Sequence, residues 1–554
     1  MILLFLLGSA SAERLWGLGP LSSFSMTGQS DFRIRYRVTN RLEPNFEESH
    51  PRLHDHIEQI EKINILFDSK KTKIRFQFDQ VSFMLNKYKL DGELKYSWNL
   101  LDSSVVSPFK DFYFIPEKVT LEHKIGRLDI GLGDVYASFG RGIALNVIQN
   151  TKVDIDTSIR GALFRYGADD WDLSVISGFT NKQQIMRFNP NLMINRDIPH
   201  FVGGTEFKRY GLLDGAVSVG THAVVSAFGE DVNTSPLVRL EEGLDSAIGG
   251  MDVELSDVLG MDWYLEGDLF HYFDRKMQGE DGPWGYTVYG SASMYTDAAI
   301  LLFEAKISKD SERINSYCNA DQWEIATPPS LEYERVITED SAAAVNSNDI
   351  VGGRINADII LDNSNVKPYV SVNFLRDTDL GGLHFNKVPE TIVHPVVGIK
   401  YTPPGTLMML NTGFRQDQRD GDNLQDRLFH LDGEYSKELS GGNGIELNVS
   451  MWSFWWGDTE HYDFLEMQNA LVFRRGEHWD FTLYQDWSNN TQLTSKGNFT
   501  DELYGALEVQ YKPTDSKAFR LLMGAYKAGI RCSGGQCRIL PGFDGVELAY
   551  RQNF

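Results

Sequence analysis

The chain has 554 residues, which is enough for several soluble domains or for one very large barrel. It carries 53 Lys and Arg against 77 Asp and Glu, and the resulting net charge of −24 excludes nucleic acid as a partner because phosphates would be repelled. With 50 glycines, 12% aromatic residues and only 18 prolines, the composition favours strands joined by turns.

The first residues, MILLFLLGSASA, have the pattern of a short export signal. An apolar core over Ile2–Leu7 precedes the small residues Ser9–Ala12, which suit a signal peptidase. We therefore expect residues 1–12 to be a signal peptide; the alternative is a buried N-terminal strand. Nowhere else does the chain approach the roughly 18 apolar residues of a membrane helix, so a membrane protein of this sequence must cross with strands.

The stretch SDFRIRYRVT, at residues 30–39, alternates apolar and basic side chains with a period of two, as a strand with two unlike faces does. Its apolar set is Phe32, Ile34, Tyr36 and Val38, and its basic set is Arg33, Arg35 and Arg37. Arg75 takes the same place within TKIRFQF at 72–78. Because a lipid-facing arginine at mid-membrane costs about 2–4 kcal/mol, we expect these arginines to line a watery lumen. The alternative is an exposed basic strand of a soluble sheet.

Similar alternation recurs along the chain, for example at 367–374, 444–455 and 479–487. Short polar turns separate these runs, and longer polar stretches such as 229–246 and 309–322 are expected to be loops. This rhythm is typical of outer-membrane barrels and predicts a closed antiparallel all-β barrel of roughly 22–26 strands. Since no globular segment precedes the first strand, we expect no separate plug domain. A soluble sandwich or propeller would also alternate, and alternation alone does not separate these classes.

Two groups of residues carry side chains that metal ions bind, and both have a polar setting that favours solvated side chains. His50, His54 and His56 lie in HPRLHDH, which is expected to be a loop. The acidic run DQRDGDNLQD, at 417–426, lacks the spacing of an EF-hand and is expected to be a solvated turn. Neither a G-x-S-x-G elbow nor an H-E-x-x-H motif occurs. We therefore expect no enzymatic activity, no metal site and no cofactor.

The segment 126–166 is unusually rich in glycine and charge, with GDVYASFGRGI at 133–143 followed by IRG at 159–161. This run resembles an uncharacterised family of large outer-membrane barrels, found mostly in Bacteroidetes-type bacteria, and the resemblance implies topology and location rather than chemistry. Its GRG is not a phosphate loop, because the motif GxxxxGK[ST] is absent. We expect a polar cluster at a bend that narrows the lumen; the alternative is a structural bulge with a satisfied ion pair. The expected members are Asp134, Tyr136, Arg141 and Arg160.

Near the C-terminus, Cys532 and Cys537 flank SGGQ and are candidates for a disulfide across a turn in an oxidising compartment. The third cysteine, Cys318, is left over.

The final stretch GVELAYRQNF, at 545–554, alternates and ends on phenylalanine. One face carries Val546, Leu548, Tyr550 and Phe554. This stretch resembles the C-terminal assembly signal of bacterial outer-membrane barrels, and it departs from that signal at Ala549 and Gln552. The resemblance implies recognition by the barrel-assembly machinery.

Together these features predict that residues 13–554 form a transmembrane β-barrel in the cell outer membrane. The expected function is that of a porin-like channel or passive transporter, with outer-membrane lipid, the assembly machinery and a small polar solute as partners. One alternative is a barrel that does not transport and instead serves as a scaffold for a surface or secretion complex. Another is a soluble secreted all-β protein.

Overall fold

The structure is a computed structural model, which describes most of the chain. The described residues are 25–38, 52–90, 93–97, 112–150, 155–180, 201–227, 245–273, 284–311, 350–361, 365–377, 389–419, 424–456, 462–489, 502–526, 529–533, 536–540 and 543–554. The expected signal peptide, His50 and Cys318 lie outside these residues.

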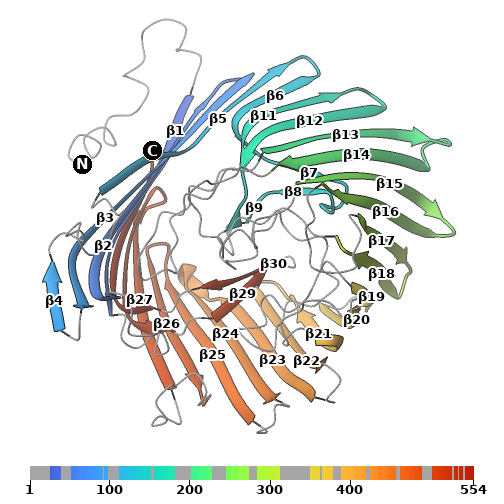
Figure 1. Cartoon of the computed structure of the whole chain (residues 1–554). Coiled ribbons are helices and arrows are strands. Elements are labelled where there is room, and N and C mark those ends of the chain that lie inside the picture. Colours follow the sequence, from blue (N-terminus) through green and yellow to red (C-terminus); the bar gives the residue numbers. More distant parts are fainter. Residues whose placement is uncertain are drawn as a thin grey trace, which may run out of the picture.

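A closed ring of 24 antiparallel strands dominates the molecule, within the range that the alternating sequence predicts (Figure 1). Ring strands follow one another around the barrel in chain order. Their bounds are β1 (Ser25–Val38), β2 (Arg52–Asp68), β3 (Thr72–Leu90), β5 (Phe112–Ile125), β6 (Leu128–Val135), β11 (Ile159–Gly167), β12 (Trp171–Thr180), β13 (Phe201–Leu212), β14 (Val217–Ala227), β15 (Ser246–Val258), β16 (Met261–Tyr272), β17 (Trp284–Tyr295), β18 (Ala299–Lys309), β19 (Ile350–Ile359), β20 (Val366–Asp377), β21 (Pro389–Tyr401), β22 (Thr406–Arg419), β23 (Leu424–Glu438), β24 (Gly444–Trp456), β25 (Tyr462–Arg475), β26 (Trp479–Ser488), β27 (Glu502–Thr514), β28 (Lys517–Tyr526) and β31 (Phe543–Asn553).

The ring closes where its first strand, β1, pairs with its last strand, β31. Arg35 lies opposite Glu547 in this register, and Phe32 lies opposite Tyr550. Beyond the last registered pair, the backbones of Gly28 and Phe554 exchange two hydrogen bonds, of 2.7 and 2.9 Å. Because the two terminal ring strands pair with each other, the described ring leaves no open sheet edge, which hydrocarbon would not tolerate.

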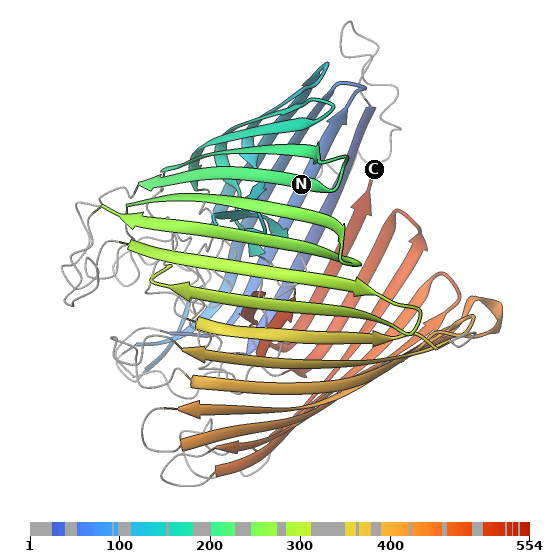
Figure 2. The ribbon, with the colours of Figure 1, turned by 90° about the vertical axis from the view of Figure 1, so that its right-hand side faces the viewer.

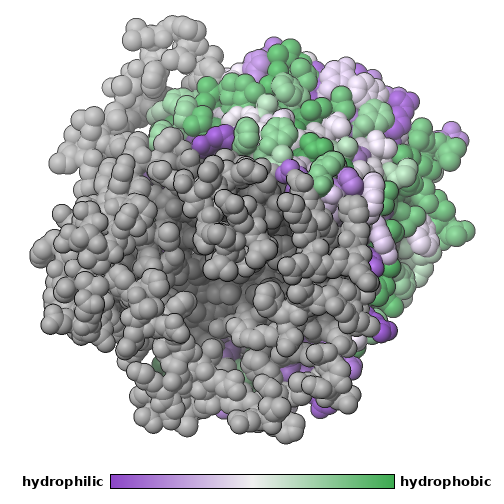
Figure 3. Space-filling model, in the orientation of Figure 1, coloured by the Kyte–Doolittle hydropathy of each residue, from purple (hydrophilic) through white to green (hydrophobic). Residues whose placement is uncertain are grey.

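The wall has an apolar outer face, and polar side chains are frequent on its inner face. On β16 and β26, Leu269 and Leu483 are 60% and 53% exposed, whereas their neighbours Asp268 and Thr482 are only 2% and 7% exposed. Figure 3 shows hydrophobic residues covering the outer wall over β11 to β16. The period-two alternation of the sequence therefore separates the two faces of a single sheet.

Short elements lie inside the ring or extend from it (Figure 1). The segment between β6 and β11 carries two small strand pairs, and the segment between β28 and β31 carries a third. These inner elements are β7 (Ala137–Phe139), β8 (Leu145–Val147), β9 (Gln149–Asn150), β10 (Ile155–Asp156), β29 (Gly529–Ser533) and β30 (Gln536–Leu540). The ring strand β3 also pairs with a short strand, β4 (Glu93–Ser97), and a 3-10 helix, η5 (Ser440–Gly442), occupies the turn between β23 and β24.

Short turns join successive strands at one end of the barrel (Figure 2). Aromatic side chains gather on the outer face beside these turns. The ring of Trp171 lies 5.1 Å from that of Tyr166 and 5.8 Å from that of Phe207, and Trp479 lies 4.5 Å from Tyr511. Such amphipathic rings mark the level of a membrane interface on transmembrane barrels.

No helix among the described residues has the length and hydrophobicity needed to cross a membrane.

Candidate functional site in the barrel lumen

The segment between β6 and β11 folds into the lumen and packs against the inner wall (Figure 1). Phe139, Ile143 and Leu145 of this segment are buried, and they join a hydrophobic cluster that includes Phe270 of the wall. Gly140 turns the chain with a φ of +59°, a conformation that glycine adopts without steric cost. The glycine-rich run therefore places a fixed stretch of backbone inside the barrel.

Backbone N–H groups of this segment donate to two carboxylates of the wall. Gly140 donates to Oε1 of Glu206 on β13 at 2.8 Å, and Arg141 donates to Oε2 of Glu266 on β16 at 2.7 Å. The guanidinium of Arg141 lies 4.5 Å from the ring centroid of Tyr264, whose hydroxyl also donates to Glu266. Because the segment lies inside the ring, these contacts identify Glu206 and Glu266 as inner-face residues.

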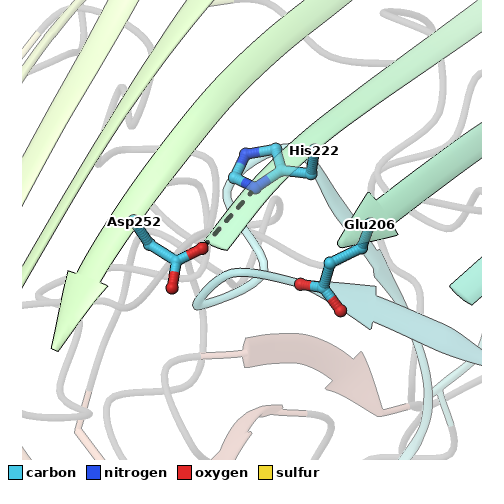
Figure 4. A group of neighbouring side chains, drawn as sticks. All are labelled: Glu206, His222 and Asp252. Carbon is cyan, nitrogen blue, oxygen red and sulfur yellow. Dashed lines mark ion pairs between the residues drawn. The ribbon is translucent and has the colours of Figure 1, made fainter. Parts of the chain in front are cut away.

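Four carboxylates surround one imidazole at this place on the wall. Figure 4 shows the imidazole of His222 with two of them, Glu206 and Asp252. Nε2 of His222 on β14 lies 2.6 Å from Oδ1 of Asp268 and 4.0 Å from Oε1 of Glu266. Its Nδ1 lies 3.9 Å from Oδ2 of Asp252 on β15. We call Glu206, His222, Asp252, Glu266 and Asp268 the His222 cluster.

Glycines make room for the His222 cluster between neighbouring strands. A Cβ at Gly220 would lie 2.0 Å from Oδ2 of Asp252. A Cβ at Gly250 would lie 2.2 Å from Oδ1 of Asp268 and 2.3 Å from Nε2 of His222. Both distances are far below van der Waals contact, so the side chains of the cluster occupy space that only these glycines leave open.

A second polar group lies on the inner face of β21 to β23. Nε2 of His394 lies 3.0 Å from Nε2 of His430, whose Nδ1 is 2.8 Å from Asp432. The fully buried Arg415 donates two hydrogen bonds of 2.7 Å to Asp417. Arg415 and Asp417 carry opposite charges and pair directly, and such pairing is how buried polar residues commonly stabilise a fold.

The structure separates the four residues that were predicted to form one polar cluster in the lumen. Arg160 pairs with Asp134 at 3.2 Å, and Asp134 also accepts the backbone N–H of Val119. In the strand register Arg160 lies opposite Phe179, which is exposed on the outer face. Asp134 and Arg160 thus occupy the alternate strand positions whose side chains face outward, as Phe179 does. The prediction that this pair lines the lumen is wrong. Spacing along the chain did not reveal on which face these positions fall.

Tyr136 and Arg141, by contrast, belong to the inward-folded segment. The amine of Lys118 on β5 donates to the hydroxyl of Tyr136 at 2.8 Å, and Arg141 stacks over Tyr264 as described above. These two residues therefore face the lumen from separate positions rather than as members of one cluster with the Asp134–Arg160 pair.

The arginines of the opening strand lie on the inner side of the β1–β31 seam. Arg33 donates to Asp31 at 2.8 Å, and Arg35 donates to the carboxylate of Glu547, which is nearly fully buried. The side chain of Arg37 lies outside the described part of the structure. The guanidinium groups of Arg33 and Arg35 therefore both have acidic partners on the same face of the wall.

Other candidate residues have simpler surroundings. Arg75 has the inner-face parity and lies 3.7 Å from Glu122 in an exposed ion pair. His54 and His56 fall within β2 rather than in the loop predicted for them, because the strand extends back to Arg52. Their side chains lie outside the described part of the structure.

The acidic run at 417–426 is not simply a solvated turn. Asp417 at the end of β22 and Asp426 at the start of β23 are both buried and lie directly opposite each other in the register. The two strands extend further than the polar sequence indicated, because tertiary partners such as Arg415 satisfy the buried charge.

The predicted C-terminal features fall on β31 and on the β29–β30 hairpin. Val546 and Leu548 of β31 are exposed on the outer face, and the ring of Phe554 covers Gly28 across the seam. Cys532 and Cys537 lie directly opposite each other in the β29–β30 hairpin. Their side chains lie outside the described part, so the disulfide stays a prediction, as does the role of the terminal strand as an assembly signal.

The His222 cluster was missed from the sequence. Its only signal is that acidic residues and a histidine occupy alternate positions within otherwise apolar strands, as in LEGDLF around Glu266 and Asp268. No spacing rule joins these residues, because β13 to β16 bring them together through lateral pairing.

No protein-family model matches the chain, and a comparison with curated proteins gives no match. Solved structures that resemble it include the siderophore receptor PirA from Pseudomonas aeruginosa, with 7% identity and a TM-score of 0.44 over 96% of this chain and 80% of that one. The copper transporter OprC has 10% identity and a TM-score of 0.44 over the same shares of the two chains. The P pilus usher PapC translocation pore has 9% identity and a TM-score of 0.39 over 96% and 99%.

The architecture itself decides where the protein resides. A closed antiparallel ring with an apolar exterior and aromatic side chains beside its turns satisfies the requirement that strands crossing a bilayer leave no backbone group unpaired. The barrel is an outer-membrane protein.

Proposed function

We propose that the protein is a porin-like channel or passive transporter for small polar solutes. The observation that carries the proposal is the charged inner face of a closed ring. Arginines and carboxylates such as Arg35, Asp31 and Glu206 lie on this face, whereas large apolar side chains lie on the opposite face. A lumen lined in this way favours hydrated polar solutes over apolar ones.

The inward-folded segment supports a role in selectivity. It carries Arg141 into the lumen and is held there by hydrogen bonds to Glu206 and Glu266. A fixed cation inside a polar passage biases the passage of charged solutes by electrostatics. Segments folded into the barrel therefore supply both a steric and an electrostatic filter.

Planar-bilayer recording of the purified barrel tests the proposal. We expect discrete conductance steps in wild-type protein, and we expect Arg141→Ala to raise the single-channel conductance and shift the ion preference toward cations, because a positive charge leaves the passage. Arg127→Ala is the matched control, since Arg127 lies in the turn between β5 and β6 and pairs with Asp169 on the exposed surface.

Barrels that are verified as folded and inserted, yet carry no current, would contradict a channel function and favour the scaffold of a surface or secretion complex. Equal conductance and ion preference in wild type and Arg141→Ala would show that Arg141 does not contribute to selectivity. This outcome would not contradict the channel function.

A further inference from the structure

We propose that the His222 cluster binds a divalent transition-metal cation on the inner wall, with Nδ1 of His222 and the carboxylates of Asp252 and Glu206 as ligands. The site goes beyond the proposed channel function and does not depend on it. A nitrogen and two carboxylate oxygens form a donor set that suits zinc and similar ions.

Three ligating side chains converge here from three adjacent strands. Figure 4 shows Glu206, His222 and Asp252 projecting from β13, β14 and β15 toward a common point. Their ligating atoms all lie within 4.8 Å of one another. The 3.9 Å between Nδ1 of His222 and Oδ2 of Asp252 accommodates one ion with bonds of about 2.0–2.2 Å to both atoms and a bent angle between them.

Buried polar atoms without hydrogen-bond partners support the metal site independently of the convergence of the three side chains. His222 and Asp252 are 5% and 2% exposed. Among the residues that the structure describes, none forms a hydrogen bond with Nδ1 of His222 or with Oδ2 of Asp252. A buried polar atom without a partner is costly, and two such atoms that face each other at 3.9 Å are both satisfied by a shared cation.

The other nitrogen of the imidazole already has the partner that a metal-binding histidine requires. Nε2 of His222 lies 2.6 Å from Oδ1 of Asp268, which suits an Nε2–H donor. A carboxylate that accepts this proton fixes the tautomer and leaves the lone pair of Nδ1 for the metal. Asp268 is thus a positioning residue rather than a ligand.

Charge balance also favours a divalent cation. The cluster contains four carboxylates, and one of them, Glu206, has the amine of Lys208 at 3.5 Å. Buried carboxylates are stable only when they are paired or bind metal ions, and a divalent ion supplies the missing positive charge in one place.

The metal would also secure the inward-folded segment. Glu206 accepts the N–H of Gly140 while it offers its carboxylate to the site. Its side chain is partly exposed, so the site opens toward the lumen. Binding of the ion would hold Glu206 in place and thereby stabilise the docking of the segment on the wall.

Zinc titration of the full-length barrel in detergent, after removal of metals with a chelator, tests the site. We expect one Zn²⁺ per chain, at least 100-fold weaker binding in Asp252→Asn and His222→Gln, and about 10–100-fold weaker binding in Asp268→Asn. Asp432→Asn is the matched control, because Asp432 contacts a buried histidine on the inner face of β23 outside the His222 cluster. This control should bind zinc as the wild type does.

Heat-modifiable migration of unboiled samples on denaturing gels shows whether each variant has folded. Cobalt bound by wild-type protein provides a measurement that needs no variant, since an imidazole-coordinated Co²⁺ absorbs in the visible range. Absence of zinc binding and of the cobalt spectrum in folded wild-type protein would overturn the proposal. Equal zinc affinity in wild type and folded Asp252→Asn would overturn it as well.

Discussion

Gly250 illustrates how single residues shape the inner wall. Its missing side chain leaves the space that Oδ1 of Asp268 and Nε2 of His222 occupy. The next residue, Gly249, has nothing within 4 Å of the corresponding Cβ position. Two adjacent glycines on opposite faces of one strand therefore differ in function: one makes room for a buried cluster, whereas the other faces open space.

We predict that Gly250→Ala destabilises the barrel by about 1–3 kcal/mol, because the added methyl group overpacks a filled site. Gly249→Ala is the control and should change stability by less than about 0.5 kcal/mol. The temperature midpoint of the heat-modifiable gel shift measures both effects. Equal midpoints for the two variants would mean that the side chains of Asp268 and His222 move aside for the added methyl group without a loss of stability.

At the scale of single elements, β31 is the strand that closes the ring. Its inner face places Glu547 between Arg35 of β1 and Arg520 of β28, and both guanidinium groups donate to this carboxylate. Its outer face carries Val546 and Leu548. One residue on the last strand thus joins its two neighbours by charge as well as by backbone pairing.

We predict that Glu547→Gln weakens the seam by about 3 kcal/mol, because two partly buried guanidinium groups lose their common counter-charge. Glu122→Gln is the matched control: its ion pair with Arg75 is exposed and 3.7 Å long, and such pairs contribute about 0–1 kcal/mol. Urea midpoints of refolded barrels in lipid vesicles measure the difference. A Glu547→Gln midpoint that coincides with that of the control would contradict a stabilising role for this triad.

At the scale of the whole molecule, the wall is a single sheet between two solvents. Leu483 near the middle of β26 is 53% exposed on the outer face, while its neighbour Thr482 is buried on the inner face. The same alternation is found in strands all around the ring. The apolar belt explains why a chain with a net charge of −24 can nevertheless be an integral membrane protein.

We predict that Leu483→Arg lowers the stability of the membrane-embedded barrel by about 2–4 kcal/mol, because the charge would face hydrocarbon. Glu477→Arg, in the short turn before β26, introduces the same side chain at an exposed position and should have little effect. The folded fraction in vesicles of defined thickness measures both. Full folding of Leu483→Arg would contradict the position of the bilayer around this belt.

The sequence alone determined the architecture, because a period of two in hydrophobicity is a local property that each strand carries by itself. It indicated the two faces of β1, the outer position of Val546 and Leu548, and a strand number near that observed. The sites depended on tertiary structure. The register between neighbouring strands decided that Arg160 occupies an outward-facing position. It also decided that His222, Asp252 and Asp268 meet from three strands. The spacing of residues along the chain does not encode such a register.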